Sequence, residues 1–319
     1  MTKARVGDQE FVELFRNLGP TEMANRLAIS QTKVHARRRR LEQKLGITIE
    51  GPNKVRSEQR IPQPQGEHRA RLEVRSGHVL VASDAHYWPG EETLLHRALV
   101  RFTKELRGSL RALILNGDVM DFPAISRHAA IGWESRPKVQ DEIEWAQERL
   151  DELQAAAGRI PLIWTLGNHD ARFESRLANL APEYAKVHGV HLKDHFPLWR
   201  PCWSVWLNDD TVCKHRFRGG IHAVHNNLLW SGKNILTGHL HSARVVSLTD
   251  YNGTRWGVDT GCLAEPSARA FTDYTEDNPL NWRSAFAVLT FVEGRLLQPE
   301  LVLKFDEKRV QFRGELITP

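Results

Sequence analysis

From residue 78 onward, short apolar runs alternate with longer stretches in which apolar residues recur every three or four positions. Short runs are typical of buried strands, and the longer recurrence is typical of amphipathic helices. The runs lie at 79–82, 111–115 and 160–165, and helical stretches lie between them at 92–107 and 139–157. Because parallel strands need crossover helices, this order predicts an α/β sheet that is at least partly parallel.

The pattern becomes strand-rich after residue 197. Hairpins are expected over 204–214, 243–259, 284–297 and 301–317. The second hairpin centres on Asn252-Gly253, a pair that favours a tight turn between antiparallel strands. These strands fit a second sheet that packs on the first.

The first 47 residues carry a separate, wholly helical pattern. Helices are expected over 9–18, 21–28 and 31–45. Gly19-Pro20 ends the first helix, and Ser30 is a suitable N-cap for the third. Residues 48–76 contain three prolines and little apolar periodicity, so a partly extended linker is expected there, followed by a large domain over 77–319.

The second and third helices resemble a helix-turn-helix. Ala24 stands where that motif takes a small residue, and Val34 stands where it takes an apolar one. Ala28 occupies the turn position at which such motifs usually have glycine. The alternative is a small helical module for oligomerisation or docking.

The net charge of +5 is unevenly distributed, because residues 1–70 contain 14 Lys or Arg against 8 Asp or Glu. A basic segment on a near-neutral body favours nucleic acid as a partner, although a solvated helix face is the alternative. Residues expected at a DNA groove or its phosphates are Gln31, Thr32, Lys33, His35, Arg37, Arg38, Arg39 and Arg40.

Other features narrow the class of protein. The three cysteines show no CxxC spacing, which argues against a zinc knuckle or a disulfide framework. The N-terminus lacks the apolar core of a signal peptide, and no apolar run is long enough for a membrane helix. A cytoplasmic protein without membrane contact is therefore expected.

Polar residues follow the predicted strands at their carboxyl ends. After the first three strands they are Ser83-Asp84-Ala85-His86, Asn116-Gly117-Asp118-Val119-Met120-Asp121 and Gly167-Asn168-His169-Asp170. After two later strands they are His215 and Gly238-His239-Leu240-His241. Because the carboxyl ends of strands in open α/β sheets meet at one crevice, these clusters are expected to converge.

Oxygen and imidazole ligands without thiolates suit Mn²⁺, Fe, Zn²⁺ or Co²⁺. Seven residues are candidate ligands: Asp84, His86, Asp118, Asn168, His215, His239 and His241. Seven ligands fit two metals bridged by one carboxylate better than a single metal. Two such metals, roughly 3.5–4 Å apart, can clamp a phosphate and generate a hydroxide nucleophile at neutral pH.

The ordered motifs D-x-H, G-D-x-x-D, G-N-H-D, H and G-H-x-H resemble the calcineurin-like metallophosphoesterase family over about residues 78–260. The resemblance implies a two-sheet sandwich flanked by helices, here preceded by a small all-α helix-turn-helix-like domain. It also implies two divalent metal ions, with manganese the first choice and iron, zinc, nickel or cobalt as alternatives.

The resemblance further implies a role for each motif residue. One metal would be held by Asp84, His86 and His241, the other by Asn168, His215 and His239, with Asp118 bridging them. His169 would be the general acid toward the leaving oxygen, and Asp121 would orient it.

The sequence departs from the family pattern at two places. His215 is followed by arginine where the family commonly has glycine, and His222 and His225 compete for the same role. His215 is favoured because it ends a strand, and His222 or His225 can then face the substrate or be a surface histidine. Phe122 follows the second motif where phosphoprotein phosphatases often have arginine, so Arg127 and His128 are candidates for the phosphate contact.

The expected function is therefore that of a metal-dependent phosphoric ester hydrolase that uses a bridging hydroxide. A nucleic-acid phosphodiester is an attractive substrate because of the basic N-terminal segment. One alternative is a DNA-binding regulatory protein whose phosphoesterase domain senses or scaffolds. Another is a phosphatase that acts on nucleotides or phosphoproteins.

Overall fold

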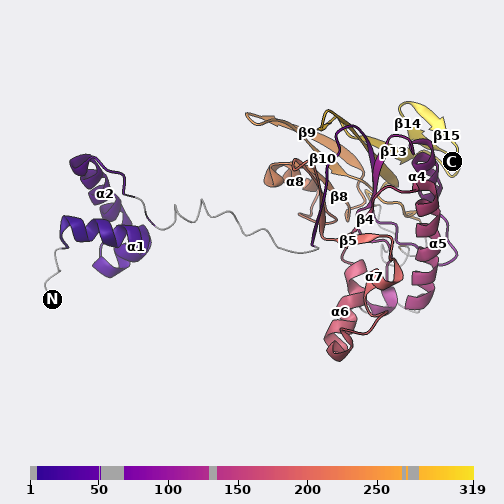
Figure 1. Cartoon of the computed structure of the whole chain (residues 1–319), viewed down its shortest axis with the longest axis horizontal. Helices are drawn as coiled ribbons and strands as arrows, with labels where there is room; N and C mark the ends of the chain where they lie inside the picture. The colour runs from indigo at the N-terminus through magenta and orange to yellow at the C-terminus, as the bar shows by residue number, and fades with distance from the viewer. Residues whose placement is uncertain (1–5, 50, 52–67, 129–134, 268–270, 272–279) are drawn as a thin grey trace. The chain divides into compact units, whose positions relative to one another are not determined.

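The computed structural model describes residues 6–49, 51, 68–128, 135–267, 271 and 280–319 (Figure 1). The chain divides into two compact units, 1–65 and 66–319. In the described part of the chain, no helix combines the length and the apolar character that a membrane crossing requires.

The smaller unit contains helices α1 (Asp8–Leu27) and α2 (Gln31–Leu45). Helix α1 is bent at Gly19, whose φ of 72° and ψ of 174° are not helical, so it consists of two helical segments as the sequence predicts. Proline follows at position 20 and cannot donate the amide hydrogen that a continuous helix needs. The buried core of this unit includes Phe11, Phe15, Met23, Val34 and Leu41.

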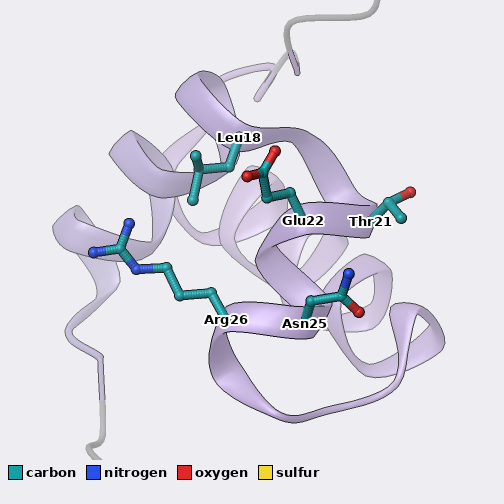
Figure 2. A pocket seen from close by; sticks show the side chains of 5 residues that line it. All are labelled: Leu18, Thr21, Glu22, Asn25 and Arg26. Carbon is teal, nitrogen blue, oxygen red and sulfur yellow. The ribbon is translucent and has the colours of Figure 1, made fainter.

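Local backbone geometry at the turn between the helices fits the sequence. The Ser30 hydroxyl accepts a hydrogen bond from the Lys33 amide at 3.4 Å, as an N-cap residue does. Ala28 ends α1 in the left-handed conformation, with φ 51° and ψ 44°. On the outer surface of α1, a shallow hollow of about 690 Å³ is lined by Leu18, Thr21, Glu22, Asn25 and Arg26 (Figure 2). Because both the Glu22 carboxylate and the Arg26 guanidinium line this hollow, it favours neither anionic nor cationic ligands.

The larger unit is built on two sheets. Among the described residues, sheet A has six strands in the order β1, β6, β7, β8, β10 and β9. Their bounds are Arg69–Leu72 (β1), Ser204–Leu207 (β6), Thr211–Cys213 (β7), Asn234–Thr237 (β8), Gly253–Asp259 (β10) and Arg244–Asp250 (β9). Strand β8 pairs in parallel with β7 on one side and with β10 on the other. Strands β9 and β10 form the antiparallel hairpin that Asn252-Gly253 predicts.

Sheet B runs in the order β15, β14, β13, β11, β2, β3, β4 and β5, with β12 paired to β11. Its strands are Gly77–Ala82 (β2), Leu110–Leu115 (β3), Leu162–Thr165 (β4), Arg200–Cys202 (β5), Ala285–Val292 (β11), Arg295–Leu296 (β12), Glu300–Lys304 (β13), Val310–Phe312 (β14) and Glu315–Ile317 (β15). Strands β2 to β5 are parallel, and β11 joins β2 in the antiparallel direction.

Helices cover the outer faces of the two sheets. The remaining helices are α4 (Leu94–Glu105), α5 (Val139–Ala157), α6 (Asp170–Leu180), α7 (Leu192–His195) and α8 (Ala223–Ser231), with 3-10 turns η1 (Pro123–Ile125) and η2 (Pro182–Tyr184). Helices α4 and α5 lie side by side along sheet B, and α8 packs on β8, β9 and β10 (Figure 1). The predicted two-sheet sandwich flanked by helices is confirmed.

Alternation along β2 explains how one strand serves two cores. Val79 and Val81 pack between the sheets, whereas Leu80 and Ala82 face the helical layer. Successive side chains of a strand point to opposite faces, so a continuous apolar run is needed when both faces are covered.

Strand β1 corrects the linker that the sequence predicts over 48–76. Arg69–Leu72 pairs in parallel with β6, and the side chain of Ala70 is fully buried. The apolar signal in the sequence is weak here, since Ala70 stands between Arg69 and Arg71. The alternation is nevertheless that of an edge strand with one buried face. Residues 50 and 52–67 of the predicted linker lie outside the described residues.

Candidate metal centre

The carboxyl ends of β2, β3, β4, β7 and β8 meet at one end of the sandwich. Backbone hydrogen bonds hold the loops that follow these strands against one another. The Asp84 amide donates to the Gly117 carbonyl at 2.9 Å, and the His86 amide donates to the Asp118 carbonyl at 3.1 Å. The Gly238 amide donates to the His215 carbonyl at 3.0 Å, which joins the two sheet A loops. The predicted convergence of strand ends therefore exists.

Three groups of side chains lie at this edge, and within each group the ligand atoms lie within 4.8 Å of one another. They are Asp84 with His86 and His241, His86 with Asp121 and His169, and Asp118 with His215 and His239. Most of these side chains are buried, although His169 and His239 are partly exposed.

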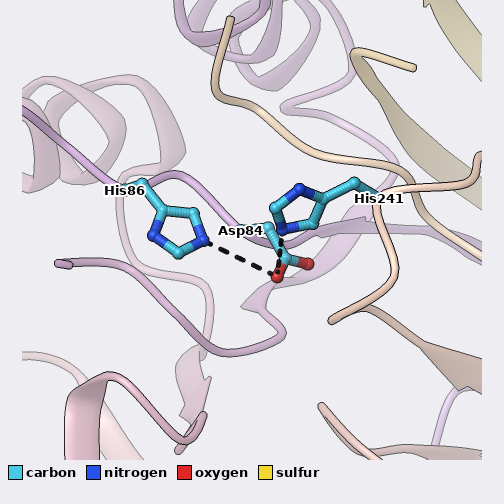
Figure 3. A group of neighbouring side chains, drawn as sticks. All are labelled: Asp84, His86 and His241. Carbon is cyan, nitrogen blue, oxygen red and sulfur yellow. Dashed lines mark hydrogen bonds and ion pairs between the residues drawn. The ribbon is translucent and has the colours of Figure 1, made fainter. Parts of the chain in front are cut away.

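Asp84 is the centre of the first group (Figure 3). Its Oδ1 lies 3.0 Å from Nε2 of His241 and 3.9 Å from Nε2 of His86. The His239 amide donates to both carboxylate oxygens of Asp84, at 3.1 and 2.9 Å. The main chain of the G-H-x-H motif thus fixes the carboxylate that its histidines face.

In the third group, His215 lies with its Nε2 3.0 Å from Oδ2 of Asp118 and 4.0 Å from Oδ1 of Asp84. Its Nδ1 lies 2.8 Å from the Asn116 carbonyl, so Nδ1 carries a proton and Nε2 is the ring atom that faces the two carboxylates. The competing His222 and His225 are exposed on and before α8, away from this cluster. His225 is absent from the residues that line the cleft beside the site.

Donor chemistry and unpaired atoms both fit a metal. Nε2 of His86 and Oδ1 of Asn168 are buried without a hydrogen-bond partner in the part of the chain that is described, and Nε2 of His215 faces the Asp118 carboxylate at 3.0 Å. An unpartnered buried polar atom costs about 1–3 kcal/mol, and metal coordination would remove that cost. For His86 the other ring nitrogen, Nδ1, is engaged 3.1 Å from Asp121, which leaves Nε2 as the coordinating atom.

The backbone at the site is strained. Several candidate ligands adopt positive φ, a region that residues other than glycine seldom occupy. They are Asp84 (53°), His86 (41°), Asp118 (51°), His239 (72°) and His241 (55°). Such strain costs on the order of 1–3 kcal/mol per residue and persists where the surrounding structure imposes it, most often at functional sites.

At two motif positions only glycine fits, because a Cβ would have no room. A Cβ on Gly167 would overlap the Asp118 carboxylate, and a Cβ on Gly238 would overlap the carboxylate of Asp84. Neither glycine has a positive φ, so close approach of the backbone to an anionic ligand is the reason for glycine.

Asp170 holds together the loops that follow β3 and β4. Its carboxylate accepts hydrogen bonds from the amides of Asp118 (2.8 Å), Val119 (2.9 Å) and Gly167 (2.8 Å). The indole of Trp164 donates a fourth, at 3.0 Å. Although Asp170 is the first residue of α6, its carboxylate faces the metal-centre loops and not the first-turn amides of that helix.

His169 and Asp121 form a pair beside the cluster. Nδ1 of His169 lies 2.6 Å from Oδ1 of Asp121, and Nε2 lies 3.8 Å from Oδ2 of Asp118. Arg172 donates to the Asp121 carbonyl at 2.7 Å and lies 3.2 Å from Nε2 of His169. Burial would lower the pKa of His169, but the hydrogen bond to Asp121 and the charges of Asp118 and Asp121 raise it above its usual value.

The buried carboxylates of the cluster are stabilised in their ionised form by nearby positive charge. Burial alone would raise the pKa of Asp118, but the charges of His215, His169 and His86 hold it below its usual range. Burial would lower the pKa of His215, yet Asp84 and Asp118 raise it to about 10. The cluster is therefore a cation site whose occupant competes with a proton.

A cleft of about 700 Å³ opens beside the cluster and includes Asn168 and His215 in its wall. It also contains Arg127 and His128, the two residues that the sequence suggests for a phosphate contact. Sequence reasoning did not single out Arg172, Arg176 or Trp203, which line the same cleft. The spacing of the two arginines, one helical turn apart after the G-N-H-D motif, is a signal that could have found them.

The predicted basic surface of the N-terminal unit is smaller in the structure than in the sequence. Gln31, Thr32, Lys33, Arg39 and Arg40 are exposed, and His35 is half-buried beside the ring of Phe15.

Arg37 and Arg38 are less accessible than the other arginines of this run. Arg37 is tied to Asp8 at 3.1 Å and lies over the ring of Phe11. Arg38 is paired with Glu42 and lies over Phe15. Both are half-buried structural side chains, because their guanidinium groups satisfy α1 and neighbouring carboxylates.

Comparison with known proteins gives the same family as the motifs. The family model described as calcineurin-like phosphoesterase matches residues 77–269. A search of curated proteins found no match.

Two solved structures resemble the chain. One is a conserved uncharacterized protein, a predicted phosphoesterase, from Streptococcus pneumoniae, with 14% identity and a TM-score of 0.30 over 72% of this chain and 90% of that one. The other is Vps29 from Chaetomium thermophilum, with 9% identity and a TM-score of 0.38 over 76% of this chain and 98% of that one. The calcineurin-like phosphoesterase model matches more than half of the present chain. The chain therefore belongs to the calcineurin-like phosphoesterase family and is a metal-dependent phosphoesterase.

Proposed function

We propose that the protein uses two metal ions to hydrolyse a phosphodiester, in the manner of a nuclease. The observation that carries the proposal is a buried set of oxygen and nitrogen donors at one edge of the sandwich. It includes two ligand atoms, on His86 and Asn168, that have no hydrogen-bond partner among the described residues. One ion cannot use all seven donors with ordinary coordination numbers, whereas two ions that share a carboxylate can.

In this proposal, Asp84, His86 and His241 hold one ion, and Asn168, His215 and His239 hold the other. Asp118 is the shared carboxylate, which is supported by its position between the His215 ring and the backbone amide of His169. When bound, the ions would neutralise charge on the phosphate and lower the pKa of a nucleophilic water.

His169 is proposed as the general acid. Asp121 binds Nδ1 of its ring, so Nε2 is the atom that can deliver a proton to the leaving oxygen. The raised pKa of His169 favours the protonated form that such a role needs. Arg172 lies beside Nε2 and is suited to stabilise negative charge that develops nearby.

A nucleic-acid phosphodiester is supported by basic residues beyond the metal centre, because a polyanionic chain can contact several of them at once. Cationic side chains line the adjacent cleft, and exposed basic residues occur on the N-terminal helix pair. We propose that this helix pair is a helix-turn-helix-like module that contacts DNA through Lys33, Arg39 and Arg40. Gel shifts of duplex DNA at increasing salt test it, and equal binding after Arg39 and Arg40 are changed to alanine would remove this part of the proposal.

Hydrolysis of bis-p-nitrophenyl phosphate with added Mn²⁺ tests the catalytic proposal. Asp118→Asn preserves the shape of the side chain but removes its charge. The variant is expected to lose more than about 100-fold in turnover and to bind less than two equivalents of metal, because one shared ligand serves both ions. Metal content measured on the same samples separates failure of metal binding from failure of chemistry. Metal-dependent turnover that survives in Asp118→Asn would contradict the bridging role.

A further inference from the structure

The cleft beside the metal centre carries more positive charge than one phosphate group requires. Five cationic side chains line it, and no carboxylate is among the described residues of its wall. They are Arg127, Arg172, Arg176, Lys214 and Arg216. Such a wall has an electrostatic preference for a polyanion that presents several charges in succession.

These cations come from three separate segments of the chain that line the same cleft. Arg172 and Arg176 lie one turn apart on α6, with Ser175 and Asn179 on the same side of the helix. Lys214 and Arg216 flank His215 on the opposite segment, and Arg127 follows η1. Clefts walled by one sign of charge concentrate field lines and attract counter-charged ligands.

Four of these five cations also have no acidic partner among the described residues. Arg127, Arg176, Lys214 and Arg216 form no ion pair with a carboxylate among the residues that the structure describes. Elsewhere in this unit, exposed arginines such as Arg309 and Arg313 are paired with acidic neighbours. Unpaired cations around one hollow destabilise the free protein by repulsion, which a bound polyanion would relieve.

An aromatic side chain completes the lining. Trp203, between β5 and β6, keeps 48% of its surface exposed although it is large and apolar. An exposed indole in a cationic cleft is suited to stack on an unpaired base, which contributes about 1–3 kcal/mol per base. A base inside a duplex is already stacked and cannot use this surface.

We propose that the cleft between α6 and the His215 segment is a binding groove for single-stranded nucleic acid. The groove leads a strand to the metal centre, with Arg176 and Arg216 on backbone phosphates and Trp203 against a base. This inference rests on the proposed phosphodiesterase function and specifies its substrate as an extended single strand. Asn168 and His215 belong both to the groove and to the metal centre, so the scissile phosphate and its neighbours are continuous.

Arg176→Ala/Arg216→Ala in the full chain tests the groove. Hydrolysis is measured on a 5′-fluorescein single-stranded DNA 12-mer, a blunt duplex of the same sequence, and bis-p-nitrophenyl phosphate, all with Mn²⁺. Arg295→Ala/Lys308→Ala, which removes two exposed cations on other elements, is the matched control. The N-terminal helices are present in every variant, so their contribution cancels in the comparison.

The groove variant is expected to lose at least about 10-fold more kcat/KM on the single strand than on the small diester. The salt dependence of log KM for the strand should become shallower by about 1.4, because each lost phosphate contact removes about 0.7. Trp203→Ala should cost the strand about 10-fold or more, and Trp203→Phe should restore most of it because a stacking ring is kept. The control should match the wild type on all three substrates.

Several results would overturn the inference. Equal losses on strand and small diester, an unchanged salt slope, or a wild type that prefers the duplex each contradict a single-strand groove. If the wild type cleaves only the small diester, the groove is refuted while the proposed metal chemistry stands. If no substrate is cleaved, the catalytic proposal fails, and fluorescence anisotropy of the labelled strand in EDTA still decides whether the groove variant has lost binding.

Discussion

At the scale of single residues, Asp170 shows how one buried carboxylate can support a site that it does not enter. It accepts the amides of Asp118, Val119 and Gly167 and the Trp164 indole, so it joins the loops after β3 and β4. Burial and the charge of Asp118 raise the pKa of Asp170 to about 6 in spite of these donors. The ligand loops are therefore held by a carboxylate that becomes protonated as the pH falls through about 6.

Asp170→Ala is expected to lower the free energy of unfolding by roughly 3–6 kcal/mol, because several buried donors lose their acceptor at about 1–3 kcal/mol each. Asp170→Asn keeps one acceptor oxygen and should lose less. Urea denaturation measures both changes, with Asp151→Ala on the exposed side of α5 as the control. If Asp170→Ala were as stable as the control, the anchoring role would be refuted.

Glu142 on α5 gives a pH dependence with a defined sign. Its Oε1 accepts the Phe122 amide at 2.8 Å, and Oε2 is buried without a partner among the described residues. Burial raises its pKa from 4.5 to about 8, and the charge of Asp121 adds to the rise. The protonated acid is therefore the form that the fold stabilises, and this contribution is complete below pH 4.5 and lost as the pH rises through 8.

Glu142→Gln keeps the acceptor for Phe122 but removes the titration. Relative to this variant, the wild type should lose up to about 1.4 kcal/mol of unfolding free energy per pH unit between the two pKa values. Chemical denaturation at a series of pH values measures the difference, and Glu144→Gln, exposed on the same helix, should show no such trend. A difference that does not change with pH would show that Glu142 is ionised in the folded state.

At the scale of elements, the turn between α1 and α2 carries a conformational cost that the sequence already suggests. Ala28 takes the left-handed conformation at the position where the resembling motif has glycine. That conformation costs an alanine about 1 kcal/mol or more, and glycine has no such penalty.

Ala28→Gly is therefore expected to stabilise the N-terminal unit by roughly 1 kcal/mol, despite the greater freedom of glycine in the unfolded chain. Ala36→Gly, at an exposed position inside α2, should destabilise it by about the same amount. Thermal unfolding of the full chain followed by helical circular dichroism measures both. A loss of stability in Ala28→Gly as large as in Ala36→Gly would contradict the turn geometry.

Most elements of the larger unit could be predicted because they have strong local patterns. The long amphipathic stretch at 139–157 coincides with α5, and the apolar runs before the ligand motifs coincide with β2, β3 and β4. Strand β1 could not be predicted, since its four residues carry only two apolar side chains, Ala70 and Leu72, and its partner β6 lies far along the chain. Pairing with a distant strand leaves no periodic signal of its own.

At the scale of the whole molecule, the metal centre connects two sheets that also pack on each other through a shared apolar core. Asp84 and Asp118 follow strands of sheet B, whereas His215, His239 and His241 follow strands of sheet A. A metal bound by both sets would cross-link the sheets and stabilise the folded state through binding.

Added Mn²⁺ should therefore raise the unfolding temperature of the metal-free protein. At a concentration 100 times the dissociation constant, the gain in stability is about 2.7 kcal/mol per site. Differential scanning calorimetry before and after chelation measures it, and Asp118→Asn should show a smaller rise. An equal rise in the variant would mean that Mn²⁺ stabilises the protein at another place.

The sequence alone determined the order of strands and helices, the family, and the types of residue at the strand ends, because periodicity and short motifs are local properties. Only the tertiary structure decided which side chains are used together. It brought His215 to Asp118 while leaving His222 and His225 exposed, and it turned Arg37 back onto Asp8. It also gathered the cations of the cleft from three distant segments. These outcomes depend on contacts between residues far apart in the chain, where packing and charge pairing, rather than spacing, select the partners.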